Sequence, residues 1–484
     1  MKVGTTAFPG PLIGGFLLLQ GFAITLVAMG HPTLVMTMVG AVLVLVLATA
    51  SSDVGPAMIA LVPLTQPFLL GSRGDALALY PEYVVIPAVF VWIAFSSIRS
   101  GRVAFRRSGL VLPGLVFLVV AAASLAGAAL DRGMASTSAG LATLYVHLLA
   151  LLFFVTLIEW LRPERSLYRV FVWMFSASVV VSLLGLVEYM IADAPTGRLV
   201  RIGSTLGVVF SSENRGNPNA LAAYVTIMSL MALSMMGSVR ARVRVWLASG
   251  ILLHILALLL TRSRSGLVAL LVGVLWLVLR GRRQMLWWLL PAAVVGITVA
   301  AQIPRMFERY ASILAVVSSQ DLIRFFLTID PKSIDWKYLG YFGAGGFDID
   351  ALAGANRFAA WVLGIRTFLE HPFLGIGLQM NLAYTGFSTS ENYFLDIAVM
   401  TGILGLLPVV WWGARVWRTM RLAGRLEMGK DERAFIHGFE AVMIAVAIIG
   451  LTGSILFSLK IMLTLLTLVA MLWYVVHRRM PWRA

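Results

Sequence analysis

Apolar runs of about 20 residues recur along the whole chain, and each is long enough to cross the roughly 30 Å hydrocarbon core of a membrane as a helix. The 484 residues are 60% hydrophobic and 12% charged, and the mean hydropathy is +0.91. Soluble domains are closer to half apolar and a quarter charged. The composition therefore predicts an all-α polytopic integral membrane protein, folded as a single membrane-embedded unit over residues 1–484.

The hydropathy pattern predicts about fourteen transmembrane helices. No small-residue cleavage site follows the first apolar run, so we expect that run to be retained as a span. The expected spans are 11–29, 33–50, 55–71, 81–97, 109–129, 138–160, 169–191, 217–236, 245–262, 264–280, 286–302, 393–414, 435–456 and 459–476.

Basic clusters predict the orientation of these spans, because each cluster follows an even-numbered span. By the positive-inside rule the clusters are cytoplasmic, which puts both termini in the cytoplasm and the odd-to-even connections on the outer face. The net charge of +16 then reports topology and does not indicate nucleic-acid binding. The clusters lie at 99–107, 162–169, 240–244, 280–283, 415–433 and 478–483.

Two outer connections are longer than a linker requires, at 192–216 and 303–392. The second lies between spans 11 and 12 and contains many aromatic residues, so we expect a folded lid with an amphipathic helix near 357–369 that ends before Pro372. The chain has no cysteine, and its six histidines are scattered, so we expect neither a metal nor another cofactor.

Two arginines stand where one apolar run ends and the next begins, in Thr261-Arg262-Ser263-Arg264-Ser265-Gly266 at the expected outer face. An interfacial arginine can simply extend toward lipid headgroups. A guanidinium at a helix start, with Ser and Gly beside it, also suits a diphosphate, because it stays charged and offers a planar fork of donors.

Arg357 opens the expected lid helix and shares one helical face with Trp361 and Gly364, whereas Arg366 faces elsewhere. We therefore expect Arg357 to face the membrane surface, with a solvated loop arginine as the alternative. The segment His371-Pro372-Phe373-Leu374-Gly375-Ile376-Gly377 follows. Its two glycines predict a tight turn, and His371 is expected to be a loop or cap residue.

Glu391 lies at the start of the twelfth expected span, where Ser390 is the expected N-cap and Asn392 shares the first turn. Capping alone would explain this carboxylate, and Asp396 one turn further on could contribute. A carboxylate facing two arginines could instead accept the proton of an attacking hydroxyl or hold that hydroxyl in place.

A further group precedes the eighth span on the same outer face: Arg201, Arg215 and the segment Asn217-Pro218-Asn219. The Asn-Pro-Asn segment is first a turn and helix-start signal. The amide groups could also contact the hydroxyls of a sugar.

In chain order, these segments resemble the O-antigen ligase and Wzy-type O-antigen polymerase family of bacterial envelope glycosyltransferases over roughly residues 200–410. The matching motifs are Gly203-Ser204-Thr205 with Asn217-Pro218-Asn219-Ala220-Leu221-Ala222, Ser263-Arg264-Ser265-Gly266, Arg357 ahead of His371 to Gly377, and Glu391-Asn392-Tyr393 ahead of Gly402-Ile403-Leu404-Gly405.

The resemblance implies a multispanning helical fold with a large periplasmic loop over a cavity, in the bacterial inner membrane. It implies direct transfer of a glycan from an undecaprenyl diphosphate carrier to an acceptor hydroxyl, without metal or nucleotide. Arg264 and Arg357 would hold the diphosphate, and Glu391 would act on the acceptor. Further substrate contacts are expected from Arg262, Arg201, Arg215, Asn217, Asn392 and Trp361.

Ligases of this family are expected to have histidine where this chain has Glu391. The resemblance therefore favours a polymerase that joins lipid-linked repeat units of an O-antigen, capsule or exopolysaccharide, with a chain-length regulator protein as a possible partner. Transfer to lipid A core is the alternative. A lipid-linked sugar flippase is a further alternative, although transporters typically carry charges at the membrane midplane, whereas the candidates here gather at one face.

Overall fold

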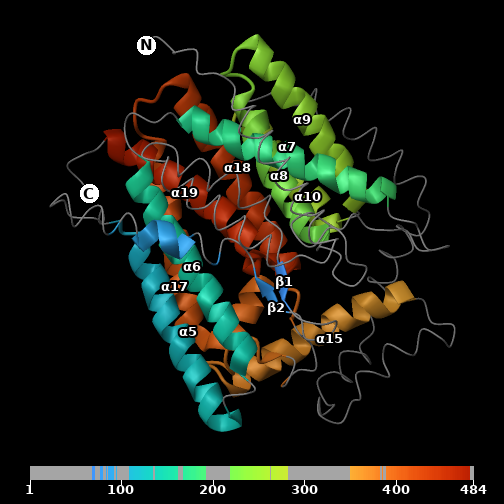
Figure 1. Ribbon diagram of the computed structural model, residues 1–484, viewed down its shortest axis with the longest axis vertical. Helices are drawn as coiled ribbons and strands as arrows, with labels where there is room; N and C mark the ends of the chain where they lie inside the picture. Colours follow the sequence, from blue (N-terminus) through green and yellow to red (C-terminus); the bar gives the residue numbers. More distant parts are fainter. Residues whose placement is uncertain are drawn as a thin grey trace.

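The computed structural model describes residues 68–70, 77–79, 83, 86–91, 94, 108–133, 137–161, 167–191, 218–261, 263–281, 349–381, 384 and 389–479. Long helices make up most of this part of the chain (Figure 1). They are α5 (Val111–Arg132), α6 (Ser138–Trp160), α7 (Leu167–Ile191), α8 (Pro218–Met235), α9 (Ala241–Thr261), α10 (Arg264–Leu279), α15 (Ile349–Glu370), α17 (Tyr393–Ala423), α18 (Lys430–Thr452) and α19 (Leu459–Arg479), with a short 3-10 helix, η6 (Ile455–Phe457), before α19.

Seven of the described helices are long and apolar enough to cross a membrane: α5, α6, α8, α9, α17, α18 and α19. Together with α7 and α10, they overlap the expected spans between 109 and 280 and between 393 and 476, although α17 continues to Ala423, beyond the expected end at 414. The protein is therefore an integral membrane protein with many apolar helices. The expected spans at 11–29, 33–50 and 286–302 lie outside the described residues, as does most of the 303–392 connection.

Helix α8 is the most buried of these spans, and it lies parallel to α10. The hydroxyl of Thr226 donates to the carbonyl of Gly266 over 3.3 Å, and one α8 turn later Leu230 packs directly against Gly273. Small residues let the two backbones approach closely, which is the usual way that helices associate within a membrane.

Helix α18 packs antiparallel to α8 on another side. The hydroxyl of Ser234 donates to the carbonyl of Ala434, and Met231 contacts Gly438 one turn further along α18. The expected span 435–456 needs correction at both ends. The helix begins at Lys430, where the Glu432 carboxylate accepts from the Gly429 N–H, and it ends at Thr452.

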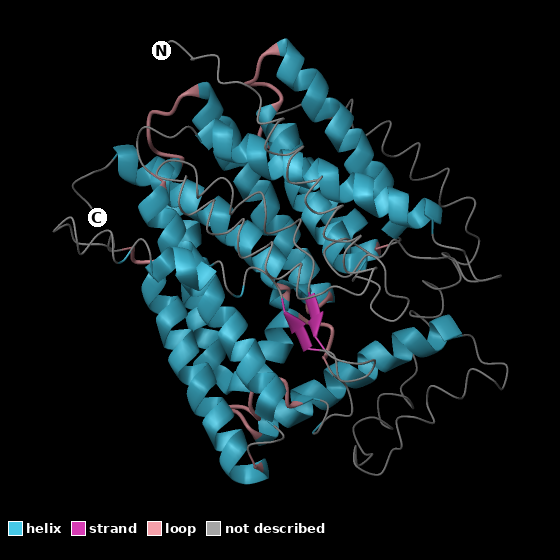
Figure 2. Cartoon of the chain, in the orientation of Figure 1, coloured by secondary structure: helices cyan, strands magenta, loops and turns pink. Residues whose placement is uncertain are grey.

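A small hairpin departs from the all-helical expectation. Strand β1 (Phe68–Leu70) pairs antiparallel with β2 (Leu77–Leu79), with Phe68 opposite Leu79. The expected third span at 55–71 therefore does not continue as a helix through Phe68–Leu70. In the view of Figure 2 the hairpin, drawn in magenta, lies between the ends of the long helices and α15.

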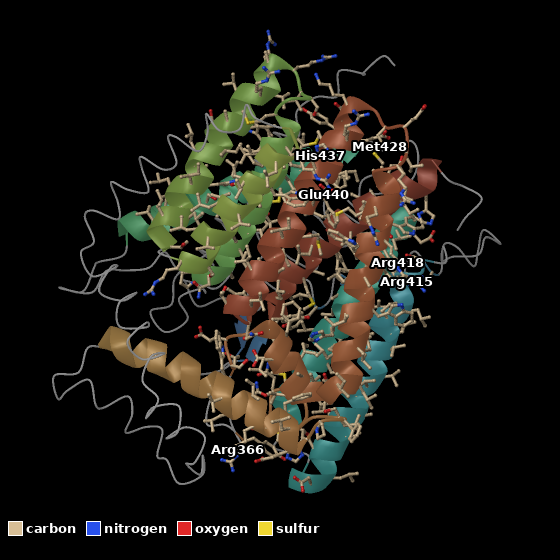
Figure 3. All side chains as sticks on the ribbon, turned by 180° about the vertical axis from the view of Figure 1, so that it is seen from behind. Arg366, Arg415, Arg418, Met428, His437 and Glu440 are labelled. Carbon is tan, nitrogen blue, oxygen red and sulfur yellow. The ribbon has the colours of Figure 1, made fainter. Side chains whose placement is uncertain are left out.

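Helix α15 lies crosswise to the long helices, at the end of the molecule opposite the start of α9 and the end of α17, which carry basic residues (Figure 1). It is longer than the helix expected at 357–369, because it begins at Ile349, but it ends at Glu370 before Pro372 as predicted. Figure 3 labels Arg415 and Arg418 on α17 far from Arg366 on α15.

Candidate functional site

Helix α17 is broken at Gly402, whose φ of 65° and ψ of −168° are not helical. Beyond the break, the N–H groups of Ile403 and Leu404 have no regular helical acceptors. They donate instead to the carbonyls of Pro372 and Phe373, over 2.8 and 3.2 Å. The loop that contains Pro372 and Phe373 therefore supplies the hydrogen-bond acceptors for the first N–H groups of the second half of α17.

The same loop satisfies the carbonyls on the other side of the break. The Val399 carbonyl accepts from the N–H of Ile376 over 3.0 Å, and the Met400 carbonyl accepts from the N–H of Gly377 over 2.9 Å. The hydroxyl of Ser124 on α5 also donates to Met400, over 2.7 Å. Backbone N–H and C=O groups must be hydrogen-bonded where water is excluded. The hydrogen bonds from the loop replace those lost at the break, so a broken helix can be accommodated in a membrane protein.

Glycine is required on both sides of this contact. Gly375 and Gly377 have φ values of 68° and 97°, which confirms the predicted tight turn. A Cβ at Gly375 would lie 2.5 Å from the Val399 carbonyl oxygen, and one at Gly402 would collide with the carbonyl of Phe373. The His371–Gly377 motif and the Gly402–Gly405 motif thus form one docked unit.

Asp396, in the first turn of α17, is fully buried and joins three segments of the chain. Its carboxylate accepts the backbone N–H of Ser390 over 2.7 Å and the side-chain amide of Asn381 over 3.1 Å. It also accepts the hydroxyl of Ser454, between α18 and η6. A buried carboxylate requires such donors, and here they fix the chain on either side of Glu391.

Glu391 occupies a left-handed backbone conformation, with φ of 54°, and its side chain is half-buried. The expected N-cap at Ser390 is wrong. Asn392 is the cap, because its side-chain oxygen accepts the N–H groups of Phe394 and Leu395. Glu391 therefore precedes the helix and does not belong to its first turn.

The predicted helix start at Arg264 is confirmed, since α10 begins at that residue. The Ser263 hydroxyl accepts the N–H of Gly266 over 3.4 Å, which caps the helix. A Cβ at Gly266 would lie 2.9 Å from the Cβ of Ala222 on α8, so the helix start is held close to α8. Arg264 is half-buried there.

The register of α10 against α18 relates Arg264 to the Asp396 cluster. The indole N–H of Trp276 on α10 donates to the Glu440 carboxylate on α18 over 3.2 Å, and the two helices are antiparallel. Arg264 lies 12 residues before Trp276, and Thr452 lies 12 residues after Glu440. Arg264 is therefore at the level of the end of α18, and the Ser454 hydroxyl that binds Asp396 follows that helix end by two residues.

Comparison with known families gives a match that includes Arg264, Glu391 and Asp396. The family model described as O-antigen ligase matches residues 249–410, which run from α9 to the middle of α17. A comparison with curated proteins gives no match. The resemblance predicted from the motifs is thus confirmed over about a third of the chain.

The segment that matches the family model contains all three predicted catalytic residues, Arg264, Arg357 and Glu391. Arg357 lies within α15, seven residues before Gly364, which packs closely against Leu395 of α17. The Arg366 guanidinium pairs with the exposed Glu370 over 3.0 Å. Trp361 is 38% exposed. Four predicted substrate contacts, Arg262, Arg201, Arg215 and Asn217, lie outside the described residues.

Asp396 has a larger structural role than the sequence predicts, because its position one turn beyond Glu391 indicates only a minor contribution. Its partners Asn381 and Ser454 lie 15 and 58 residues away in the chain, so no local motif connects them. An acidic residue within the first turn of an apolar span was the only available signal.

Proposed function

We propose that this protein is a membrane glycosyltransferase that polymerises undecaprenyl-diphosphate-linked repeat units at the periplasmic face of the bacterial inner membrane. The observation that carries the proposal is the left-handed turn of Glu391, fixed by Asp396 at the end of the bundle where α10 presents Arg264. The family match supports an envelope function of the O-antigen ligase or polymerase type.

In this reaction an acceptor hydroxyl attacks the anomeric carbon of the donor glycan. The new glycosidic C–O bond forms as the bond from that carbon to the diphosphate oxygen breaks, and the lipid diphosphate leaves. We assign Arg264 and Arg357 to the diphosphate, because fixed guanidinium groups stabilise the charge that develops on the leaving group.

Glu391 accepts the proton of the attacking hydroxyl or holds that hydroxyl toward the donor. A left-handed conformation is uncommon for glutamate and costs about 1 kcal/mol or more, and such residues are concentrated at functional sites. The three hydrogen bonds to Asp396 hold the adjacent chain and so support this conformation. A fixed carboxylate loses less orientational freedom when the acceptor binds.

We also propose roles for the other predicted substrate-binding residues. The Asn392 side-chain oxygen is used in the helix cap, so a contact with substrate would come from its amide nitrogen. Trp361 and Arg262 would contact the donor, and Arg201, Arg215 and Asn217 would contact sugar hydroxyls. The proposed orientation keeps both termini in the cytoplasm, and a chain-length regulator protein is a proposed partner.

The second candidate function is that of a ligase that transfers the glycan to lipid A core. The description of the matching family favours it directly. Glu391, where ligases are expected to have histidine, favours the polymerase. The two functions differ in the acceptor alone, so one reconstitution can distinguish them.

The test uses purified full-length protein in liposomes with an undecaprenyl-diphosphate-linked repeat unit, with and without lipid A core. A product ladder from the donor alone is expected of a polymerase, whereas product that requires lipid A core would establish the ligase. The absence of product under both conditions, from protein that is folded and inserted, would contradict both functions.

Variants then test the assigned roles. Arg264→Ala, Arg357→Ala and Glu391→Gln should each reduce the transfer rate at least 100-fold, the usual effect of removing one preorganised charge or catalytic group. Arg366→Ala is the matched control on α15, because its exposed ion pair contributes little. Wild-type transfer by Glu391→Gln would reduce Glu391 to a structural turn residue.

A further inference from the structure

Helix α15 carries an exposed row of apolar side chains. Trp361, Ile365 and Leu369 are spaced four residues apart and are 38%, 50% and 69% exposed. The row continues beyond the helix at Phe373 and Leu374, which are 69% and 41% exposed. These five residues, here called the α15 apolar face, form a patch of a kind that is rarely left in water.

The other two sides of α15 are different in character. Ala360, Leu363, Gly364 and Thr367 are buried, and Gly364 packs against α17. A third side carries the ion pair between Arg366 and Glu370, whose side chains are 40% and 54% exposed. The helix thus separates a protein-facing side, a charged side and an apolar side that no described residue covers.

The α15 apolar face ends where the chain is attached to a candidate membrane span. The Phe373 carbonyl accepts the N–H of Leu404 on α17 over 3.2 Å, so the end of the face is attached to that helix. From Leu404 onward, α17 exposes Leu407 and Val410, which are 54% and 57% exposed and belong to a candidate membrane span. If lipid covers the exposed side chains of α17, lipid should therefore cover the α15 apolar face as well.

We infer that the α15 apolar face lies in the membrane interface, with the Phe373–Leu374 turn inserted among the lipid chains of the outer leaflet. Figure 1 shows α15 crosswise to the long helices, so α15 would run along the plane of a membrane that those helices cross, as an interfacial amphipathic helix requires. Arg366 and Glu370 remain on the aqueous side. The arrangement anchors the lid of the proposed active site to the bilayer from which a lipid-linked donor would arrive.

The absence of cysteine from the chain makes a direct test simple, because single-cysteine variants need no background removal. A nitroxide is attached to Leu369→Cys or Phe373→Cys in the full-length protein, which is reconstituted into liposomes of phosphatidylethanolamine and phosphatidylglycerol. Collision rates with oxygen, which partitions into lipid, and with a water-soluble nickel chelate are then compared. Glu370→Cys is the matched control next to Leu369, and Leu407→Cys is the lipid reference.

The expected result is that oxygen exceeds the nickel chelate at 369, 373 and 407, and that the order reverses at 370. Preferential collision with the nickel chelate at both 369 and 373 would place the face in water. Exclusion of both reagents there would place it under protein. Either outcome overturns the inference, and neither depends on transfer activity, so failure here is distinct from failure of the proposed function.

Discussion

Replacement of Gly402 by alanine should destabilise the protein, and the structure gives the magnitude. The φ and ψ of Gly402 lie in a region that is essentially restricted to glycine, which costs another residue about 1–3 kcal/mol. Relief of the collision with Phe373 would also weaken the two hydrogen bonds from Ile403 and Leu404 to the loop, each contributing about 0.5–1.5 kcal/mol. The free energy of unfolding should therefore fall by about 2–6 kcal/mol.

The assay is SDS-induced unfolding of the purified protein in detergent micelles, followed by tryptophan fluorescence. Gly413→Ala is the matched control on the same helix, because a Cβ there would meet no atom within 4 Å. In a helix interior that change should raise the free energy of unfolding by about 0.5–1 kcal/mol. If Gly402→Ala proved as stable as Gly413→Ala, the docking of the loop onto a broken α17 would be refuted.

Asp396→Asn should lower the free energy of unfolding by about 1–3 kcal/mol, because an amide NH₂ would face the donors Ser390, Asn381 and Ser454. It should also lower kcat more than it raises the KM for donor, since the Glu391 turn loses its anchor; an unchanged kcat in folded protein would contradict this positioning role. Arg280→Ala should lower stability by about 1–3 kcal/mol, because the largely buried Glu440 loses a guanidinium at 2.8 Å. Transfer by the folded Arg280→Ala protein should stay at the wild-type rate, because this ion pair lies at the opposite end of α10 from Arg264. A loss of specific activity would argue against an active site confined to the Arg264 end of the helices.

The positions of the spans could be predicted from the sequence because a membrane imposes one rule on every spanning segment. The segment must be apolar over about 20 residues and must satisfy its own backbone as a helix. The starts of α10 at Arg264 and α6 at Ser138 were predicted to the residue, and the end of α15 before Pro372 was also correct. The tight turn at Gly375 and Gly377 was predicted because glycine tolerates positive φ.

Local rules were insufficient where two helical signals competed. Ser390 and Asn392 are both good N-cap residues, and only the packing of α17 selected Asn392. The continuous apolar run at 393–414 gave no sign of the break at Gly402, because hydropathy does not distinguish a straight helix from one interrupted by a docked loop.

The sequence alone determined that the chain spans a membrane, where most of its helices lie, and which residue types are available at one end of them. The tertiary structure alone decided that the His371–Gly377 turn completes a broken α17 and that Asp396 joins Ser390, Asn381 and Ser454. The physical reason is that hydropathy and capping act within one or two helical turns, whereas these contacts join residues up to 58 positions apart. Such pairs become neighbours only when the helices have packed, and Glu391 is held in its place by them.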